Sequence, residues 1–245
     1  MPSPLTKAHR REAVKKTRVL IAQTWESQLN LSIFLGVLVL TVFVIPSFDP
    51  AYIYSRLAGD VTYSIILICA VAIAWGMPRL FTLSACLGVL ALGVRWAAWW
   101  FQSGDFELVR EITTLLSVGL VCWILIVQVF RPGNVTHVRV QGAIAVYLLL
   151  GLGWAQAYKI VSYLRPDSFQ SAVANFSSGV NWHYFSFVTL TTLGYGDIVP
   201  IRPLARSLAI GEALTGQLYL TVLIARLVAL EVMSLQPNAD ADSSQ

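Results

Sequence analysis

Charged residues are scarce in this sequence. Of its 245 residues, 12% are charged and 56% are hydrophobic, and the mean hydropathy is +0.67. An ordinary soluble domain has about 25% charged residues, so the scarcity excludes that class and indicates an integral membrane protein. The formal net charge of +4 does not indicate nucleic-acid binding, because the basic residues gather at the N-terminus and at the ends of apolar segments.

Cysteine and histidine are also rare, and neither forms a recognisable site. The cysteines lie inside apolar runs without the spacing of a disulfide framework or a metal site, and the histidines are scattered. These residues are Cys69, Cys86, Cys122, His9, His137 and His183. The sequence contains no nucleophile paired with a base, no metal-ligand cluster and no phosphate-binding loop. We therefore expect neither enzymatic activity nor a cofactor.

Long apolar segments dominate the chain instead. A helix needs about 20 apolar residues to cross a bilayer, and six segments approach that length, although the second is short. They are residues 29–45, 61–75, 80–100, 112–130, 143–164 and 204–230. Proline and glycine mark several of the breaks between them. The sequence predicts an all-α integral membrane fold with six transmembrane helices.

The distribution of charge predicts the orientation of these helices. Residues 1–28 form a basic segment, which either attracts anionic lipid or acts as a positive-inside flank. Both interpretations place the N-terminus in the cytoplasm. Six spans then return the polar and disordered tail, residues 236–245, to the same side. We expect a multi-pass protein of the plasma membrane with both termini cytoplasmic.

The remaining charges agree with this orientation. It places four arginines at the inner face and four acidic residues at the outer face. These are Arg79, Arg131, Arg139 and Arg226 inside, and Asp49, Asp60, Asp105 and Glu107 outside. Arg95 lies near the outer end of the third span beside several tryptophans, so we expect it to reach the interface by extending along Trp99.

A glycine-containing segment between the last two spans carries the strongest functional signal. Residues 191–197 read TTLGYGD, and glycines two residues apart allow successive carbonyl groups to point the same way. The preceding apolar stretch, residues 182–191, is too short to cross a bilayer, so it predicts a re-entrant helix. Its C-terminal end carries partial negative charge from the helix dipole, which favours a cation.

The segment from Thr192 to Gly196 resembles the potassium channel signature, with Leu193 at the position where that pattern has valine. The resemblance implies a selectivity filter in which backbone carbonyls bind K⁺ and the Thr192 hydroxyl lies at the inner end. The residues implied to bind K⁺ are Thr192, Leu193, Gly194 and Tyr195, and Gly196 completes the filter outward.

The same resemblance assigns roles to residues around the filter. Asp197 would stand at the outer mouth and hydrogen-bond to an aromatic residue behind the filter. Tyr184 and Phe185 occupy positions where many family members carry paired tryptophans. Together with Thr191 they are expected to support the filter from the short helix predicted over residues 182–191, the pore helix.

Two residues of the last span are candidates for gating. Gly216 is either a hinge of the inner helix or a point of close helix contact. Glu212 is an ionisable group inside the bilayer, which is by default a functional candidate. Its expected partners are Thr189, Thr215 or the network that supports the filter, and a protonated carboxyl bonded behind the pore helix is the alternative.

The resemblance also suggests a division into regions. Residues 29–131 would form a peripheral four-helix region similar to a voltage sensor, and residues 138–235 a two-helix pore domain with a re-entrant loop. However, the fourth span, 112–130, lacks every arginine or lysine that such a sensor carries. Strong voltage gating is therefore not expected.

These expectations combine into a potassium-selective channel subunit that conducts K⁺ passively. One filter segment supplies a quarter of a ring of carbonyls, so the working unit would be a homotetramer in the lipid bilayer. Two alternatives stay open. Leu193 and the altered pore-helix aromatics could loosen the filter and give a weakly selective cation channel. The fold could also serve a non-conducting membrane sensor or assembly subunit.

Overall fold

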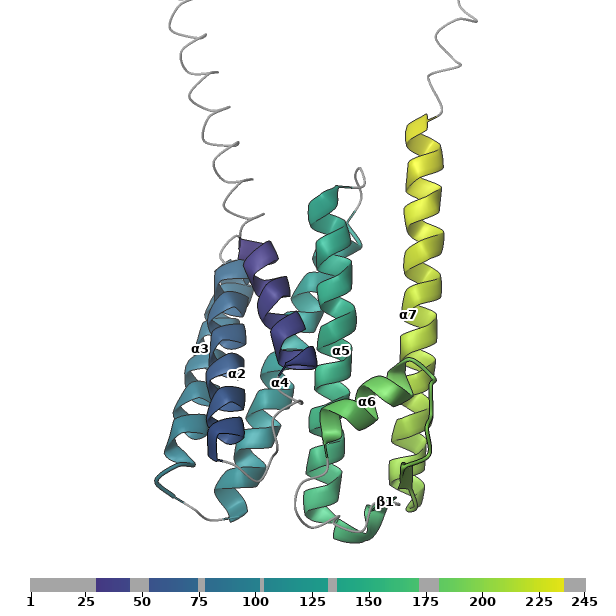
Figure 1. Cartoon of the computed structure of the whole chain (residues 1–245). Helices are drawn as coiled ribbons and strands as arrows, with labels where there is room; N and C mark the ends of the chain where they lie inside the picture. The colour runs from purple at the N-terminus through teal and green to yellow at the C-terminus, as the bar shows by residue number, and fades with distance from the viewer. Residues whose placement is uncertain are drawn as a thin grey trace, which may run out of the picture.

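The computed structural model describes residues 30–44, 53–74, 78–101, 104–131, 136–171 and 181–235 (Figure 1). The basic segment 1–28 and the tail 236–245, for which the sequence makes predictions, lie outside the described residues.

The described chain is mostly helical. Its long helices are α2 (Ile53–Ile73), α3 (Pro78–Ala97), α4 (Gly104–Val129), α5 (His137–Leu164) and α7 (Pro203–Leu235). By length and composition, these five are able to cross a membrane. The first expected span forms a shorter apolar helix, Asn30–Phe43, within the described residues. Between α5 and α7 lies the short helix α6 (Trp182–Leu190).

Two helices begin well before the expected spans. α2 begins at Ile53 rather than 61, and α4 begins at Gly104 rather than 112. The sequence-based boundaries stopped at charged residues, since an unpaired charge is costly in a bilayer. In the structure these charges are part of the helices, and several have partners on neighbouring helices: Arg56 pairs with Glu107, Asp60 with Arg95 and Glu111 with Lys159.

Arg95 corrects one prediction directly. It does not extend along Trp99 to the interface but is 4% exposed inside the helix bundle. Its guanidinium donates to Asp60 Oδ1 at 2.6 Å and to Thr114 Oγ1 at 2.6 Å, and Trp99 Nε1 donates to Asp60 Oδ2 at 2.8 Å. Asp60 is thus a buried member of α2 rather than a residue beyond its end. Pairing satisfies both charges and makes their burial tolerable.

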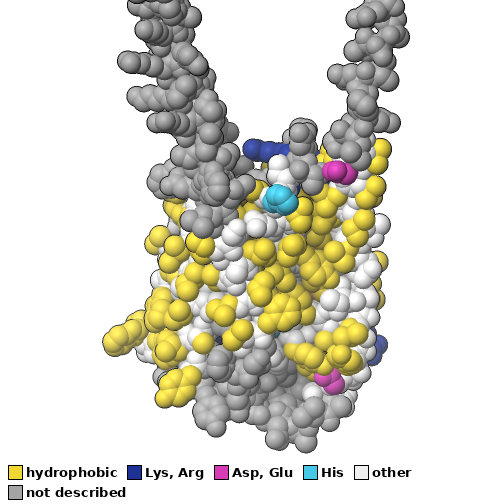
Figure 2. All heavy atoms as spheres, turned by 45° about the horizontal axis from the view of Figure 1, so that its top comes forward, with side chains coloured by type: hydrophobic (Ala, Val, Ile, Leu, Met, Phe, Trp, Pro, Cys, Tyr) yellow, Lys and Arg dark blue, Asp and Glu magenta, His cyan; other side chains and the backbone are white. Residues whose placement is uncertain are grey.

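α5 lies at the centre of the arrangement (Figure 1). On one side, the helix Asn30–Phe43, α2 and α4 pack against it through a shared apolar core that includes Phe34, Ile66, Leu125 and Leu149. On its other side are α6 and α7. Figure 2 shows hydrophobic side chains over the middle of one face and charged side chains near its two ends, as expected for a surface within a bilayer.

A short antiparallel pair of strands closes the end of the bundle near α6. β1 (Phe169–Ser171) follows the 3₁₀ turn Pro166–Ser168 and pairs with β2 (Ile198–Pro200). The all-α expectation did not include these strands. They tie the end of α5 to the start of α7, and the ion pair between Arg202 and Asp167 reinforces the connection.

Candidate functional site

The short helix α6 ends directly at the glycine-containing segment. Its N-terminus is capped by Asn181, whose Oδ1 accepts from the Tyr184 backbone N–H at 3.1 Å. At its C-terminus the Thr191 hydroxyl donates to the Phe187 carbonyl at 2.7 Å. α6 enters from the end of the bundle opposite the C-terminal end of α7 and stops within it (Figure 1). α6 therefore forms the short helix expected before the glycines.

Aromatic packing holds the first half of α6. Phe185 lies against Tyr158 of α5 with ring centroids 4.8 Å apart, and against Phe169 of β1 at 5.6 Å. Phe169 also contacts Trp182 at 4.9 Å. These contacts are edge-on, which is a favoured arrangement of aromatic rings. Phe185 therefore connects α5, α6 and the strand pair, and the sequence suggested it as a support of the filter.

The backbone after α6 turns its N–H groups back toward the helix. Thr192 N donates to the Thr189 carbonyl at 2.9 Å, and Leu193 N and Gly194 N donate to the Val188 carbonyl at 2.9 and 3.3 Å. Among the described residues, none donates a hydrogen bond to the carbonyl oxygens of residues 192–196. The segment thus uses its donors internally and leaves its acceptors available.

Backbone angles alternate along this segment. φ is +59° at Thr192, +57° at Gly194 and +81° at Gly196, whereas Leu193 and Tyr195 have the ordinary negative values. Alternation of this kind makes successive carbonyl groups point toward one side. Glycine adopts positive φ without penalty, but Thr192 does so at a cost of about 1–2 kcal/mol. The sequence predicted the role of the glycines and did not predict this conformation of Thr192.

Two tyrosines contact the C-terminal end of the segment. The Tyr184 hydroxyl donates to Asp197 Oδ2 at 2.7 Å, and Asp197 Oδ1 accepts from the Ile198 backbone N–H at 3.0 Å. The rings of Tyr184 and Tyr195 are stacked, with 5° between their planes. The hydrogen bond expected between Asp197 and an aromatic residue is therefore present, and Tyr184 supplies it.

The C-terminal end of α6 packs against a glycine of α7. A Cβ added at Gly216 would lie 2.3 Å from the Leu190 carbonyl oxygen. Of the two roles considered for Gly216, the structure displays the close contact. A second glycine, Gly151 of α5, meets α6 at Phe187, where an added Cβ would lie 2.5 Å from the ring. α6 is held between two helices that approach it at glycine.

Glu212 lies fully buried behind α6. Its Oε2 accepts from the Tyr158 hydroxyl at 2.5 Å, and its Oε1 lies 2.5 Å from the Ser186 hydroxyl. Thr189 and Thr215, named as possible partners, instead bond to the carbonyls of Phe185 and Gly211 in their own helices. These two candidate partners were wrong, because hydroxyls on apolar helices can bond to the backbone carbonyl four residues earlier.

The sequence did not indicate the contacts that join the peripheral helices to this site. The Tyr63 hydroxyl of α2 lies 2.8 Å from His183 Nε2 on α6 and accepts from Gln156 Nε2 of α5 at 2.8 Å. Lys159 of α5 donates to Glu111 of α4 at 2.6 Å. His183 appeared isolated in the sequence because Tyr63 is 120 residues away. The signal for these contacts in the sequence was the presence of polar residues within apolar runs.

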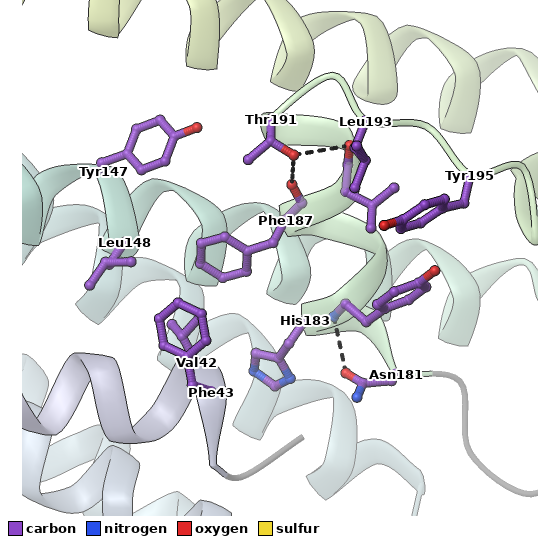
Figure 3. A pocket seen from close by; sticks show the side chains of 12 residues that line it. Val42, Phe43, Tyr147, Leu148, Asn181, His183, Phe187, Thr191, Leu193 and Tyr195 are labelled. Carbon is purple, nitrogen blue, oxygen red and sulfur yellow. Dashed lines mark hydrogen bonds between the residues drawn. The ribbon is translucent and has the colours of Figure 1, made fainter. Parts of the chain in front are cut away.

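A cavity of about 560 Å³ lies beside the segment (Figure 3). α5, α6 and the end of the helix Asn30–Phe43 surround it, and Leu193 and Tyr195 contribute to its lining (Figure 3). Leu193 is 57% exposed and Tyr195 66% exposed. The side chains of the segment therefore lie on a surface that one copy of the chain leaves uncovered.

Comparisons with known proteins concern this same region. Residues 143–232 match a family model described as "Ion channel". A two-pore potassium channel of Arabidopsis thaliana is 42% identical over 81 residues, which cover 33% of this chain and 27% of the relative. The inward rectifier potassium channel Kirbac3.1 of Paramagnetospirillum magnetotacticum is 38% identical over 80 residues, which cover 31% and 24%. A voltage-gated potassium channel of Aeropyrum pernix is 37% identical over 83 residues, covering 34% and 25%.

The similarity is therefore local. The chain spans about a quarter of the length of these curated relatives, and no solved structure matches it. The matched region contains most of α5, all of α6, the glycine-containing segment and most of α7. In this region the chain is similar to ion channels, which agrees with the expectation that it is not an enzyme.

Proposed function

We propose that the chain is a subunit of a potassium-selective channel that conducts K⁺ passively across the membrane. The observation that carries this proposal is the backbone of residues 192–196. Its φ angles alternate in sign, its first N–H groups are bonded to α6, and its carbonyl oxygens accept no hydrogen bond from the described residues. Such oxygens are able to replace the hydration shell of an ion.

The surroundings of the filter favour a cation. α6 directs its C-terminal end, with the partial negative charge of the helix dipole, toward the start of the filter. Asp197 adds a carboxylate at the other end, held by Tyr184. Thr192, Leu193, Gly194 and Tyr195 would bind K⁺ as the permeant ion, and no other cofactor is proposed. Gly196 would continue the filter to its outer mouth.

A tetramer follows from the geometry of coordination. One chain supplies one filter strand, and a closed ring of carbonyls needs four around an axis. The surface of the chain agrees, because most of α7 is not buried within one copy. Its exposed residues include Leu214, Leu218 and Val222. We propose that this face of α7, with Leu193 and Tyr195, is covered by neighbouring copies and lipid.

The channel is proposed not to be strongly voltage-gated. α4 carries no lysine or arginine between Ile112 and its end at Val129. The buried arginines of the peripheral helices, Arg95 and Arg110, are paired with carboxylates. We place the protein in the plasma membrane with both termini in the cytoplasm, and the basic N-terminal segment near anionic lipid.

Reversal potentials of the purified protein in liposomes test the proposal. Under opposed K⁺ and Na⁺ gradients, the potential should follow the K⁺ gradient. Gly194→Ala should abolish the K⁺ preference, because alanine is strained at a φ of +57°. Gly119→Ala is the matched control, because an added Cβ there meets open space on α4.

The outcomes separate the three candidate functions. Equal permeability to K⁺ and Na⁺ in the wild-type protein would refute selectivity and indicate a weakly selective cation channel. If no ion flux occurs in a protein shown to be tetrameric, the sensor or assembly role is left. If Gly194→Ala behaves like Gly119→Ala, the segment is not the filter.

A further inference from the structure

Two matched contacts attach α6 to α7. Ser186 and Leu190 lie one helical turn apart on α6, and Glu212 and Gly216 lie one turn apart on α7. Ser186 meets Glu212 at 2.5 Å, and the Leu190 carbonyl lies against Gly216. Residues four apart share one face of a helix, so one face of α7 holds one face of α6. α6 ends immediately after Leu190, where the filter begins.

The hydrogen bonds around Glu212 can be assigned by counting protons. Ser186 has one hydroxyl proton, yet two acceptors lie within its reach. The Gly151 carbonyl of α5 is 2.7 Å away and Glu212 Oε1 is 2.5 Å away. A protonated Glu212 satisfies every group: it donates from Oε1 to Ser186, Ser186 donates to Gly151, and Tyr158 donates to Glu212 Oε2. An ionised Glu212 would leave Ser186 with one proton for two acceptors.

Within the part of the chain that the structure describes, no positive charge pairs with Glu212: no lysine, arginine or histidine forms an ion pair with it. The titratable groups that face it are Tyr158, in direct contact, and Tyr147, at longer range, both on α5. Both are neutral tyrosines. Glu212 and its two hydroxyl partners, Tyr158 and Ser186, are almost completely buried, and an unpaired carboxylate is very unfavourable in such surroundings.

We propose that Glu212 is a neutral carboxylic acid that positions the pore helix, and so sets the position of the selectivity filter. It joins three helices through a directed chain of hydrogen bonds from Tyr158 of α5 through Glu212 of α7 and Ser186 of α6 to the Gly151 carbonyl of α5. It acts on the permeant ion only through α6. The positioning role rests on the proposed channel function, whereas the protonation state does not.

Substitutions at Glu212 separate a neutral positioning group from a charged one. Glu212→Gln keeps the shape, and its amide donates to Ser186 while its carbonyl accepts from Tyr158. It should retain the wild-type K⁺/Na⁺ permeability ratio. Glu212→Ala removes both contacts and should lower the ratio about tenfold, the scale of one lost buried hydrogen bond. Retention of the tetramer, measured by size-exclusion chromatography, shows that a variant has folded.

Ser186→Ala tests the other end of the chain of hydrogen bonds. It should lower the permeability ratio as Glu212→Ala does. Ser64→Ala is its matched control, because the Ser64 hydroxyl of α2 bonds only to the Asp60 carbonyl of its own helix. If Glu212→Gln is as defective as Glu212→Ala, a charge is required and the proposal is wrong. Wild-type ratios in both Glu212→Ala and Ser186→Ala also overturn it.

Infrared difference spectroscopy tests the protonation state without any ion flux. The wild-type spectrum minus that of Glu212→Gln at neutral pH should contain the C=O band of a protonated carboxyl, which shifts in D₂O. A carboxylate band in its place would refute neutrality even in a selective channel. If the wild-type protein does not discriminate K⁺ from Na⁺, the proposed function fails while this spectrum still decides the state of Glu212.

Discussion

Two buried glutamates in this chain have opposite surroundings. Glu111, on α4 of the peripheral region, is 5% exposed and accepts from Arg110 at 2.7 Å and from Lys159 at 2.6 Å. Glu212, on α7, is completely buried, and its partners among the described residues are hydroxyl groups. The side chain is the same, but its partners differ. Partners therefore decide whether a buried carboxyl carries charge.

The peripheral helices and the region of α5, α6 and α7 differ in the same way as these two glutamates. The peripheral helices bury full charges in pairs, of which Arg95 with Asp60 is the most enclosed. The region of α5, α6 and α7 instead holds α6 with neutral hydrogen bonds and with close contacts at Gly151 and Gly216. A paired charge is sensitive to loss of its partner, whereas a glycine contact is sensitive to added volume. Different substitutions should therefore damage the two regions.

The largest effect is expected from breaking the most buried ion pair. Arg95→Leu leaves the Asp60 carboxylate without its cation and should reduce stability by about 3–5 kcal/mol, measured by thermal unfolding in detergent. The double variant Arg95→Leu, Asp60→Leu removes both charges and should recover most of this loss. If the double variant is less stable than Arg95→Leu alone, the charge-pair explanation of this region is wrong.

The second-largest effect is expected from added volume in the region of α5, α6 and α7. Gly216→Ala places a methyl group 2.3 Å from the Leu190 carbonyl, so α6 must move, at a cost of about 1–3 kcal/mol. Selectivity should fall with stability because the filter follows α6. Gly93→Ala on α3, where an added Cβ meets nothing within 4 Å, is the control. A selective and stable Gly216→Ala protein would argue against the close contact.

The link between the two regions should have a smaller effect. Tyr63→Phe removes the hydroxyl that contacts both His183 and Gln156, and should reduce stability by about 1–2 kcal/mol. Because His183 belongs to α6, the permeability ratio should change as well. Tyr54→Phe on the same helix is the control, since Tyr54 is 75% exposed. An effect on stability without any effect on permeability would mean that the peripheral helices do not influence the filter.

The smallest effect is expected at the exposed ion pair near the strands. A hydrogen bond from Arg202 lowers the pKa of Asp167 below its ordinary value of 3.8. The contribution of Asp167 to stability is therefore present above that value and is lost as the pH falls through the lowered pKa. Asp167→Asn should be slightly less stable than wild type at neutral pH and equal to it in strong acid. A thermal unfolding series over pH checks this, and high salt should reduce the difference.

Much of the architecture was predictable from local sequence. Apolar length predicted helices close to α3, α5 and α7, and the short apolar stretch before the glycines predicted the short helix that α6 forms. These predictions succeed because helix length and glycine geometry depend on nearby residues. The starts of α2 and α4 were wrong, because several of the charged residues there have partners on other helices.

The site was predictable only in part, for the same reason. The glycines and Asp197 stood out in the sequence, and Glu212 was unusual by its position in an apolar span. Its partners could not be identified, because Tyr158 and Ser186 are 54 and 26 residues away and only packing brings them to it. The pairing of β1 with β2 was missed because each strand has three residues and no pattern of its own.

By itself, the sequence determined a membrane protein with a glycine-containing segment after a short apolar helix, because hydropathy and backbone freedom are local properties. Only the tertiary structure decided that Arg95 is buried against Asp60, that Thr192 takes a positive φ, and that Glu212 meets hydroxyls instead of cations. Burial and partnership depend on which helices pack together, and therefore on residues far apart in the chain.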